Sequence, residues 1–114
     1  MEKGGKMNFL ELVEEVRDRL SQKDVSHIPG VLAFQFDITG KAAGTFYVEV
    51  KDGILSVEPY EYYDRHAIFT LNGSNLKRLM SGKLDPVAAF TSGKIKIDGD
   101  TNKAMELVAI IKQN

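Results

Sequence analysis

Two Ser-Gly-Lys tripeptides, at residues 81–83 and 92–94, have the residue types that can hold a phosphate. A phosphate loop presents backbone N–H groups from glycines, precedes a helix, and follows its lysine with a serine or threonine that binds Mg²⁺. Here Leu84 and Ile95 follow the two lysines, and both tripeptides end a predicted helix, where exposed carbonyl groups repel anions. We therefore interpret both glycines as helix-terminating residues with positive φ.

No other residues form a pattern typical of catalysis or metal binding. Cysteine is absent, which excludes disulfides and thiolate chemistry, and His27 and His66 lie far apart in different kinds of segment. The serines lack the Gly-x-Ser-x-Gly sequence of a nucleophile elbow. Asp98 and Asp100 flank Gly99, and a turn followed by a helix cap accounts for this pair. We expect no catalytic residues, no metal and no cofactor.

The length and charge of the chain indicate one domain without a strongly charged surface. The chain has 114 residues, enough for one hydrophobic core, and its net charge is −1. We expect neither nucleic-acid binding nor integral membrane association, because there is no excess of basic residues and no apolar run long enough to span a bilayer. Residues 1–6 are predicted to be a flexible tail and residues 7–114 the domain. The lack of cysteine fits a cytoplasmic protein.

The hydrophobic periodicity predicts an α+β fold. Apolar residues recur every three or four positions in helices and alternate in half-buried strands. The predicted elements are helix 7–23, strands 31–40, 45–53, 54–59 and 65–73, helices 74–84 and 85–93, strand 94–98 and helix 100–114. The predicted N-caps are Asn8, Ser74, Asp85 and Asp100. Because strands and helices are largely segregated along the chain, we expect a five-stranded, mainly antiparallel sheet with helices packed on one face.

An aromatic and acidic segment connects the third and fourth predicted strands. Its aromatic and acidic residues are Tyr60, Tyr62, Tyr63, Glu58, Glu61 and Asp64. One interpretation is the rim of a ligand site or a strip that binds a partner. The other is an exposed turn whose rings cover an edge of the sheet. Both interpretations are open at the level of sequence.

The inward-facing side chains of the predicted elements are unusually large. The chain has six phenylalanines and four methionines, and several of them lie on the predicted inner faces of strands and helices. Methionine is flexible and suits an irregular cavity lining. These faces either meet in a packed core or enclose a hollow, and periodicity does not distinguish the two.

Residues 79–107, LMSGKLDPVAAFTSGKIKIDGDTNKAMEL, resemble the sterol carrier protein type 2 domain family, whose members bind lipids. The resemblance rests on motifs that follow the family's spacing without a gap. They are Gly82-Lys83, Asp85-Pro86, Ala89-Phe90, Gly93 through Ile97, Gly99-Asp100 and Ala104. Residues 44–57 and 67–79 are similar to the family's second to fourth strands and the helix that follows them. The family's order of elements agrees with the order predicted from periodicity.

The resemblance implies non-covalent binding, and transfer, of a lipid such as a fatty acid, a fatty acyl chain or a sterol-like molecule. It places this ligand in an apolar tunnel between the sheet and the helices. The residues expected to line the tunnel are chosen by their inward periodicity. They are Phe34, Phe36, Phe46, Val48, Phe69, Leu79, Met80, Phe90, Ile95, Met105 and Val108. The last helix, or the short helices that end at Gly82 and Gly93, are candidate gates.

A second class of function also fits the resemblance. The family's fold occurs as an appended domain in larger enzymes, so the alternative is a fully packed interaction or dimerisation module without a lipid ligand. The Tyr60–Tyr63 segment would then form the contact of a homodimer. The sequence differs from the family pattern at His66, where members often have an acidic residue. It ends without a peroxisomal targeting tripeptide, and we expect a stand-alone prokaryotic member.

Overall fold

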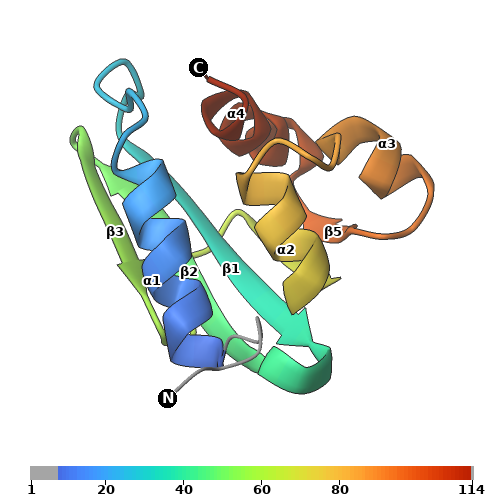
Figure 1. Cartoon of the computed structure of the whole chain (residues 1–114). Coiled ribbons are helices and arrows are strands. Elements are labelled where there is room, and N and C mark those ends of the chain that lie inside the picture. The colour runs from blue at the N-terminus through green and yellow to red at the C-terminus, as the bar shows by residue number, and fades with distance from the viewer. Residues whose placement is uncertain (1–7, 114) are drawn as a thin grey trace.

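The structure, a computed structural model, describes residues 8–113 and has helices packed on one face of a five-stranded sheet (Figure 1). Its helices are α1 (Phe9–Leu20), η1 (Gly40–Ala42, a 3-10 turn), α2 (Gly73–Met80), α3 (Pro86–Thr91) and α4 (Thr101–Ile111). Its strands are β1 (Val31–Thr39), β2 (Gly44–Lys51), β3 (Ile54–Glu58), β4 (Ala67–Asn72) and β5 (Lys96–Gly99). The α+β class and the predicted order of elements are confirmed. The predicted tail, residues 1–6, lies outside the described residues.

The strands lie in the order β3-β2-β1-β4-β5. As the sequence predicts, β1, β2 and β3 form an antiparallel meander, and β5 also pairs with β4 in the antiparallel sense. β4 is parallel to β1 and lies on the opposite side of β1 from β2. A parallel pair needs a crossover connection, and residues 59–66 provide it. The sheet is therefore mixed but mostly antiparallel.

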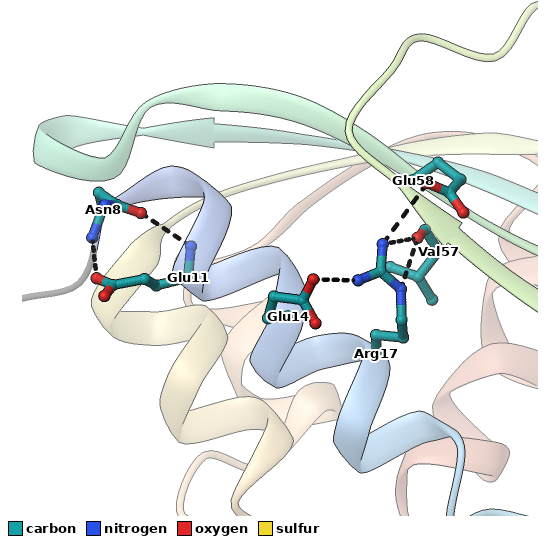
Figure 2. Close-up of polar contacts among 6 residues, drawn as sticks. All are labelled: Asn8, Glu11, Glu14, Arg17, Val57 and Glu58. Carbon is teal, nitrogen blue, oxygen red and sulfur yellow. Dashed lines mark hydrogen bonds and ion pairs between the residues drawn. The ribbon is translucent and has the colours of Figure 1, made fainter.

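α1 begins with a capping box, and an arginine fixes the helix to the rest of the molecule (Figure 2). Asn8 Oδ1 accepts a hydrogen bond from the Glu11 backbone N–H at 2.9 Å, and the Asn8 N–H donates to Glu11 Oε1 at 3.1 Å, which confirms Asn8 as the N-cap. Arg17 donates from Nε and Nη2 to the Val57 carbonyl at 3.1 and 2.5 Å. Its Nη1 also lies 2.6 Å from Glu14 Oε2. Because Val57 belongs to the edge strand β3, Arg17 ties α1 to that edge.

The predicted caps of α3 and α4 are confirmed. Asp85 accepts a hydrogen bond from the Ala88 N–H at 2.9 Å, and Pro86 occupies the first turn of α3. Asp100 accepts from the Lys103 N–H at 3.0 Å at the start of α4. Both carboxylates also lie at the positive end of a helix dipole, where a negative charge is favourable.

The predicted cap of α2, Ser74, is wrong. Asn72 is the N-cap, and its Oδ1 accepts a hydrogen bond from the Asn75 N–H at 2.7 Å. Asn72 ends β4 and has extended backbone angles, φ −85° and ψ 166°, which an N-cap requires. The helix therefore begins directly at the end of the strand, and Ser74 lies in its first turn.

The two glycines of the Ser-Gly-Lys tripeptides end α2 and α3, as predicted. Gly82 and Gly93 have φ angles of +80° and +84°, a region that favours glycine. In both cases the N–H of the following lysine donates, at 2.8 Å, to a carbonyl five positions earlier in the chain. These bonds are those of a Schellman-type helix end, so the N–H groups that a phosphate would need are used within the fold.

The end of α4 is joined to the loop after α1. The Gln113 side chain forms hydrogen bonds with both backbone groups of Asp24. Its Oε1 accepts from the Asp24 N–H at 2.7 Å, and its Nε2 donates to the Asp24 carbonyl at 2.8 Å. Lys23 Nζ donates to the Gln113 carbonyl at 2.5 Å. Through these bonds the first and last helices of the described chain are held together at one end of the molecule (Figure 1).

The connection 59–66 crosses the outer face of the sheet, opposite the helices. Gln35 Oε1 accepts a hydrogen bond from the Tyr62 N–H at 3.2 Å. The Tyr62 hydroxyl donates to Glu49 Oε2, and the Tyr62 ring lies 4.9 Å from the Tyr47 ring, centroid to centroid. Tyr62 therefore covers the middle of the outer face, over β1 and β2.

The aromatic segment is thus divided between two environments. Tyr62 is packed on the sheet, whereas Tyr60 is exposed and Tyr63 is 97% exposed. The interpretation that rings of this segment cover the sheet therefore holds for Tyr62, although it covers a face and not an edge. Only Tyr60 and Tyr63 remain available for a partner.

Replacing Tyr62 by phenylalanine is expected to lower the free energy of unfolding at pH 7 by about 1 kcal/mol, because Glu49 loses its donor. The hydrogen bond to Glu49 and burial raise the pKa of Tyr62 from 10.0 to about 12. A raised pKa means that folding favours the neutral hydroxyl, so this contribution is complete below pH 10.0 and is lost as the pH rises through about 12. The stability difference between wild type and Tyr62→Phe should shrink across this window, measured by urea unfolding.

The matched control is Tyr63→Phe, which removes a hydroxyl from a side chain that is almost fully exposed. It should change the free energy of unfolding by less than about 0.5 kcal/mol at every pH. A Tyr62→Phe difference that stays constant from neutral to strongly alkaline pH would contradict the assigned hydrogen bond.

Candidate functional site

Three phenylalanine rings form a continuous row across the inner face of the sheet, the face toward the helices. The register places Phe46 of β2 and Phe69 of β4 directly beside Phe36 of β1. The Phe36 ring stacks on both, with centroid distances of 4.9 and 4.8 Å and interplanar angles of 8° and 6°. Phe34 meets Phe69 edge-on at 5.6 Å. All four rings are at most 1% exposed, and they form the apolar floor of the interior.

The helices cover this floor with apolar side chains. In each helix the buried residues recur every three or four positions, on the side that faces the sheet. They are Leu12, Val13, Val16 and Leu20 of α1, Leu76, Leu79 and Met80 of α2, and Ala104, Leu107, Val108, Ile110 and Ile111 of α4. Figure 1 shows α1 over the β2–β3 side of the sheet, and α4 contacts β1, β4 and β5.

Nine of the eleven residues that the sequence assigns to the lining are buried, and all of these except Val108 belong to one core cluster. They are Phe34, Phe36, Phe46, Val48, Phe69, Leu79, Met80, Ile95 and Val108. Strand alternation and helix periodicity identify them correctly as inward-facing. Whether they contact a ligand remains a prediction.

The predicted burial of Phe90 and Met105 is wrong. Phe90 is 41% exposed and Met105 is 36% exposed. α3 has only six residues and buries Pro86 and Ala89, so Phe90, one position after Ala89, is turned toward solvent. Met105 follows the buried Ala104 in α4 and lies at the edge of that helix's apolar face. A neighbouring position in a helix is rotated by about 100°, which is enough to leave the inner face.

The predicted lining contains no residue of α1, although the inward side chains of this helix cover part of the floor. The helical periodicity of Leu12, Val13 and Val16 is the signal that identifies them. Phe9 is a less obvious case. Its ring lies flat against Gly44, where an added Cβ would come within 2.6 Å of the Phe9 Cδ1 atom. Only a glycine permits the ring to approach the start of β2 this closely.

The chemistry of this interior is apolar throughout. Gln35 is the one polar residue that is buried among residues 8–113, and its side chain lies on the outer face, where it bonds Tyr62 and Asp37. The same residues contain no group of His, Asp and Glu side chains that is placed to hold a metal ion. Within this range no helix is both long and apolar enough to cross a membrane. The interior is suited to holding an apolar molecule by burial of surface.

Residues 73–95, from α2 through α3, are joined to the rest of the molecule differently from α1 and α4. α1 is tied to β3 through Arg17, and α4 is tied to the first loop through Gln113. Within the described chain, the hydrogen bonds of residues 73–95 join residues no more than six positions apart. This part of the roof is therefore held on the floor by apolar contacts alone.

The fold is that of a small α+β domain whose helices enclose an apolar interior on one face of the sheet. Residues 10–112 match the SCP-2 sterol transfer family, and the chain belongs to this family. The chain is 36% identical over 100 residues to sterol carrier protein 2 of Bos taurus, which covers 87% of this chain and 18% of the relative. The chain thus spans about a fifth of the length of the curated relatives that it matches.

Solved structures share the fold across nearly the whole chain. The solution structure of sterol carrier protein 2 from Aedes aegypti in complex with the C16 fatty acid palmitate has a TM-score of 0.65 and 19% identity, and covers 94% of this chain and 96% of that one. The structure of palmitated SCP2L2 from Aedes aegypti has a TM-score of 0.69 and 21% identity, and covers 95% and 97%. At these identities the likeness establishes the fold.

Proposed function

We propose that this protein binds a lipid with a long acyl chain, such as a fatty acid, between the phenylalanine row and the helices, and transfers it between lipid surfaces. The observation that carries the proposal is the composition of the interior: a floor of stacked rings roofed by apolar side chains. Membership of a sterol transfer family supports it, as does the palmitate bound to two proteins of the same fold. The contacting residues are the nine buried residues named above.

The binding energy in this proposal comes from the hydrophobic effect. Each CH₂ group of an acyl chain that leaves water contributes about 0.8 kcal/mol. Among residues 8–113, the buried interior offers no charged group for acid–base or nucleophilic chemistry, so the ligand is held and released unchanged. We therefore propose a carrier and not an enzyme.

An acyl chain reaches the phenylalanine row only if part of the roof moves, because the rings are at most 1% exposed. We assign this movement to α2 and the segment that follows it. The local hydrogen bonding of residues 73–95 supports this choice over α1 and α4, which are tied across the fold. Gly82, with φ +80° and no atom within 4 Å of an added Cβ, is a suitable pivot.

The test is palmitate binding by wild type and by Met80→Trp. Met80, in the last turn of α2, is buried, and a tryptophan there fills space that the acyl chain needs. Overfilling an interior costs about 1–3 kcal/mol, so palmitate should bind at least about fivefold more weakly. Native mass spectrometry gives the stoichiometry, and displacement of a fluorescent fatty acid gives the affinity. A wild-type protein that binds no fatty acid of any chain length would overturn the proposal.

Met105→Trp is the matched control, since it makes the same change on the exposed side of α4. It should bind palmitate like wild type, and circular dichroism should show both variants folded. Equal affinity of Met80→Trp and wild type would place the ligand elsewhere than beneath α2.

A second candidate function is an interaction module with a fully packed interior. It is favoured by the exposure of Tyr60 and Tyr63, which leaves two aromatic rings available for a homodimer contact. Absence of lipid binding together with a dimer in light scattering would select this candidate.

A further inference from the structure

The outer side of α3 is uncharged and mainly apolar. α3 buries Pro86 and Ala89, whereas Val87 is 51% exposed and Phe90, as noted, is also turned to solvent. Residues 86–93 contain no charged side chain. Figure 1 shows α3 at the periphery of the molecule. A helix on the surface of a protein usually has polar or charged residues on its outer side, so this exposed face is unusual.

Basic residues flank this helix in the sequence. Lys83 and Lys94 adjoin its two ends, both are exposed, and neither forms an ion pair with any residue from 8 to 113. Residues 73–96 contain five basic side chains and one acidic one, Asp85, whose carboxylate caps α3. This segment therefore has a net charge of +4 in a chain whose net charge is −1. Such a concentration of positive charge attracts an anionic surface.

We propose that α3, with Lys83 and Lys94, docks the protein on an anionic lipid surface. Val87 and Phe90 enter the boundary between head groups and acyl chains, and the two ammonium groups contact the phosphate and carboxylate groups of the lipids. Lysine suits this position because its long stem extends along apolar surface while its charge stays among the head groups. A nucleic acid would use the lysines but not the apolar side chains between them, and the combination therefore favours a membrane.

This inference rests on the proposed function in one respect: a carrier must meet the membrane that supplies or receives its lipid. The docking surface follows α2 directly in the chain, and the Lys83 N–H donates at 2.8 Å to the Arg78 carbonyl of α2, the part of the roof assigned to open. Contact at α3 therefore brings the opening of the interior to the lipid surface. Docking itself requires no bound ligand.

The experiment measures binding of the full chain to vesicles of equal parts phosphatidylcholine and phosphatidylserine, and to vesicles of phosphatidylcholine alone, by co-sedimentation. Wild type should bind the anionic vesicles more tightly, and added salt should weaken this binding. Lys83→Gln with Lys94→Gln should weaken it by about 25-fold, at about fivefold for each basic residue. Val87→Asp should weaken it at least tenfold, because a carboxylate then faces the anionic lipid.

Each variant has a matched control elsewhere on the surface. Lys41→Gln with Lys51→Gln removes two exposed lysines outside the segment, and Ile54→Asp changes a 67% exposed residue at the tip of the β2–β3 hairpin. Both should bind anionic vesicles within about twofold of wild type, because screening limits the effect of distant charges. Val87→Asp should fold normally, since an acidic residue is favourable in the first turn of a helix.

The outcomes separate this inference from the proposed function, because palmitate binding is measured without vesicles. A protein that binds palmitate but not anionic vesicles overturns the docking surface alone. Vesicle binding that depends on Val87, Lys83 and Lys94 supports it, even if palmitate does not bind. Equal loss in the control variants shows that net charge and not α3 causes the attraction, and overturns the inference.

Discussion

Replacing Phe36 by alanine is expected to lower the free energy of unfolding by about 3–5 kcal/mol, the range for removing a buried aromatic ring. Phe36 is the middle ring of the row and stacks on Phe46 and Phe69, so the change leaves a void with ring faces on two sides. Small domains have a total stability of about 5–15 kcal/mol, and the loss is a large share of it. Urea unfolding followed by circular dichroism measures the change.

Two variants show whether the row itself is responsible. Phe90→Ala removes the same ring from a side chain that is 41% exposed, and should cost about 1 kcal/mol or less. Phe36→Leu keeps most of the volume and should cost less than about 1.5 kcal/mol. If Phe36→Ala costs no more than Phe90→Ala, the rings do not form the closely packed floor described here.

The sequence predicts the inner face of each strand but not how the faces meet. Phe36, Phe46 and Phe69 follow from the alternation of apolar and polar residues, a signal within each strand. Their contact requires that β2 pair with β1 in one register and that β4 lie beside β1 and parallel to it. Both conditions depend on the turn at residues 40–43 and on the crossover connection, whose paths are set by contacts between distant parts of the chain.

The same limit explains the errors at the helices. Ser74 was predicted as the N-cap from the residues of the helix alone. The helix in fact begins where β4 ends, at Asn72. Phe90 fits an inward stripe when α3 is considered with the segment after it, but a six-residue helix buries only what faces the rest of the molecule. Short elements give too few residues for periodicity to define a face, and their orientation is decided by tertiary packing.

Local sequence patterns also could not predict the polar contacts that fix the connection 59–66 and the end of α4. Gln35 and Tyr62 are far apart in sequence, as are Asp24 and Gln113, and each pair meets only in the folded chain. The caps at Asn8, Asp85 and Asp100 were predictable because donor and acceptor are three residues apart. Three of the four short-range caps were therefore predicted, the cap of α2 at Asn72 being the exception, and the long-range contacts were found in the structure.

Replacing Gly99 by alanine is expected to destabilise the fold by about 3 kcal/mol or more, through backbone strain and steric overlap. Gly99 has φ +125°, a region that side-chain-bearing residues rarely adopt, and an added Cβ would lie 2.6 Å from the His66 carbonyl oxygen. Relief of this contact must move β5 away from β4, where Gly99 pairs with Ala67. It also breaks the 2.9 Å hydrogen bond from the Asp100 N–H to that carbonyl, next to the cap of α4. Thermal and urea unfolding measure the loss.

Gly93→Ala separates the two causes, because Gly93 also has positive φ, +84°, but no atom lies within 4 Å of an added Cβ. Only backbone strain applies there, and the cost should be about 1–2 kcal/mol. The excess at Gly99 then measures how closely the edge strand β5 approaches the end of β4, the contact that positions α4 over the inner face. If both substitutions lower the free energy of unfolding equally, β5 does not pack closely against the end of β4, and Gly99 is needed only for its positive φ.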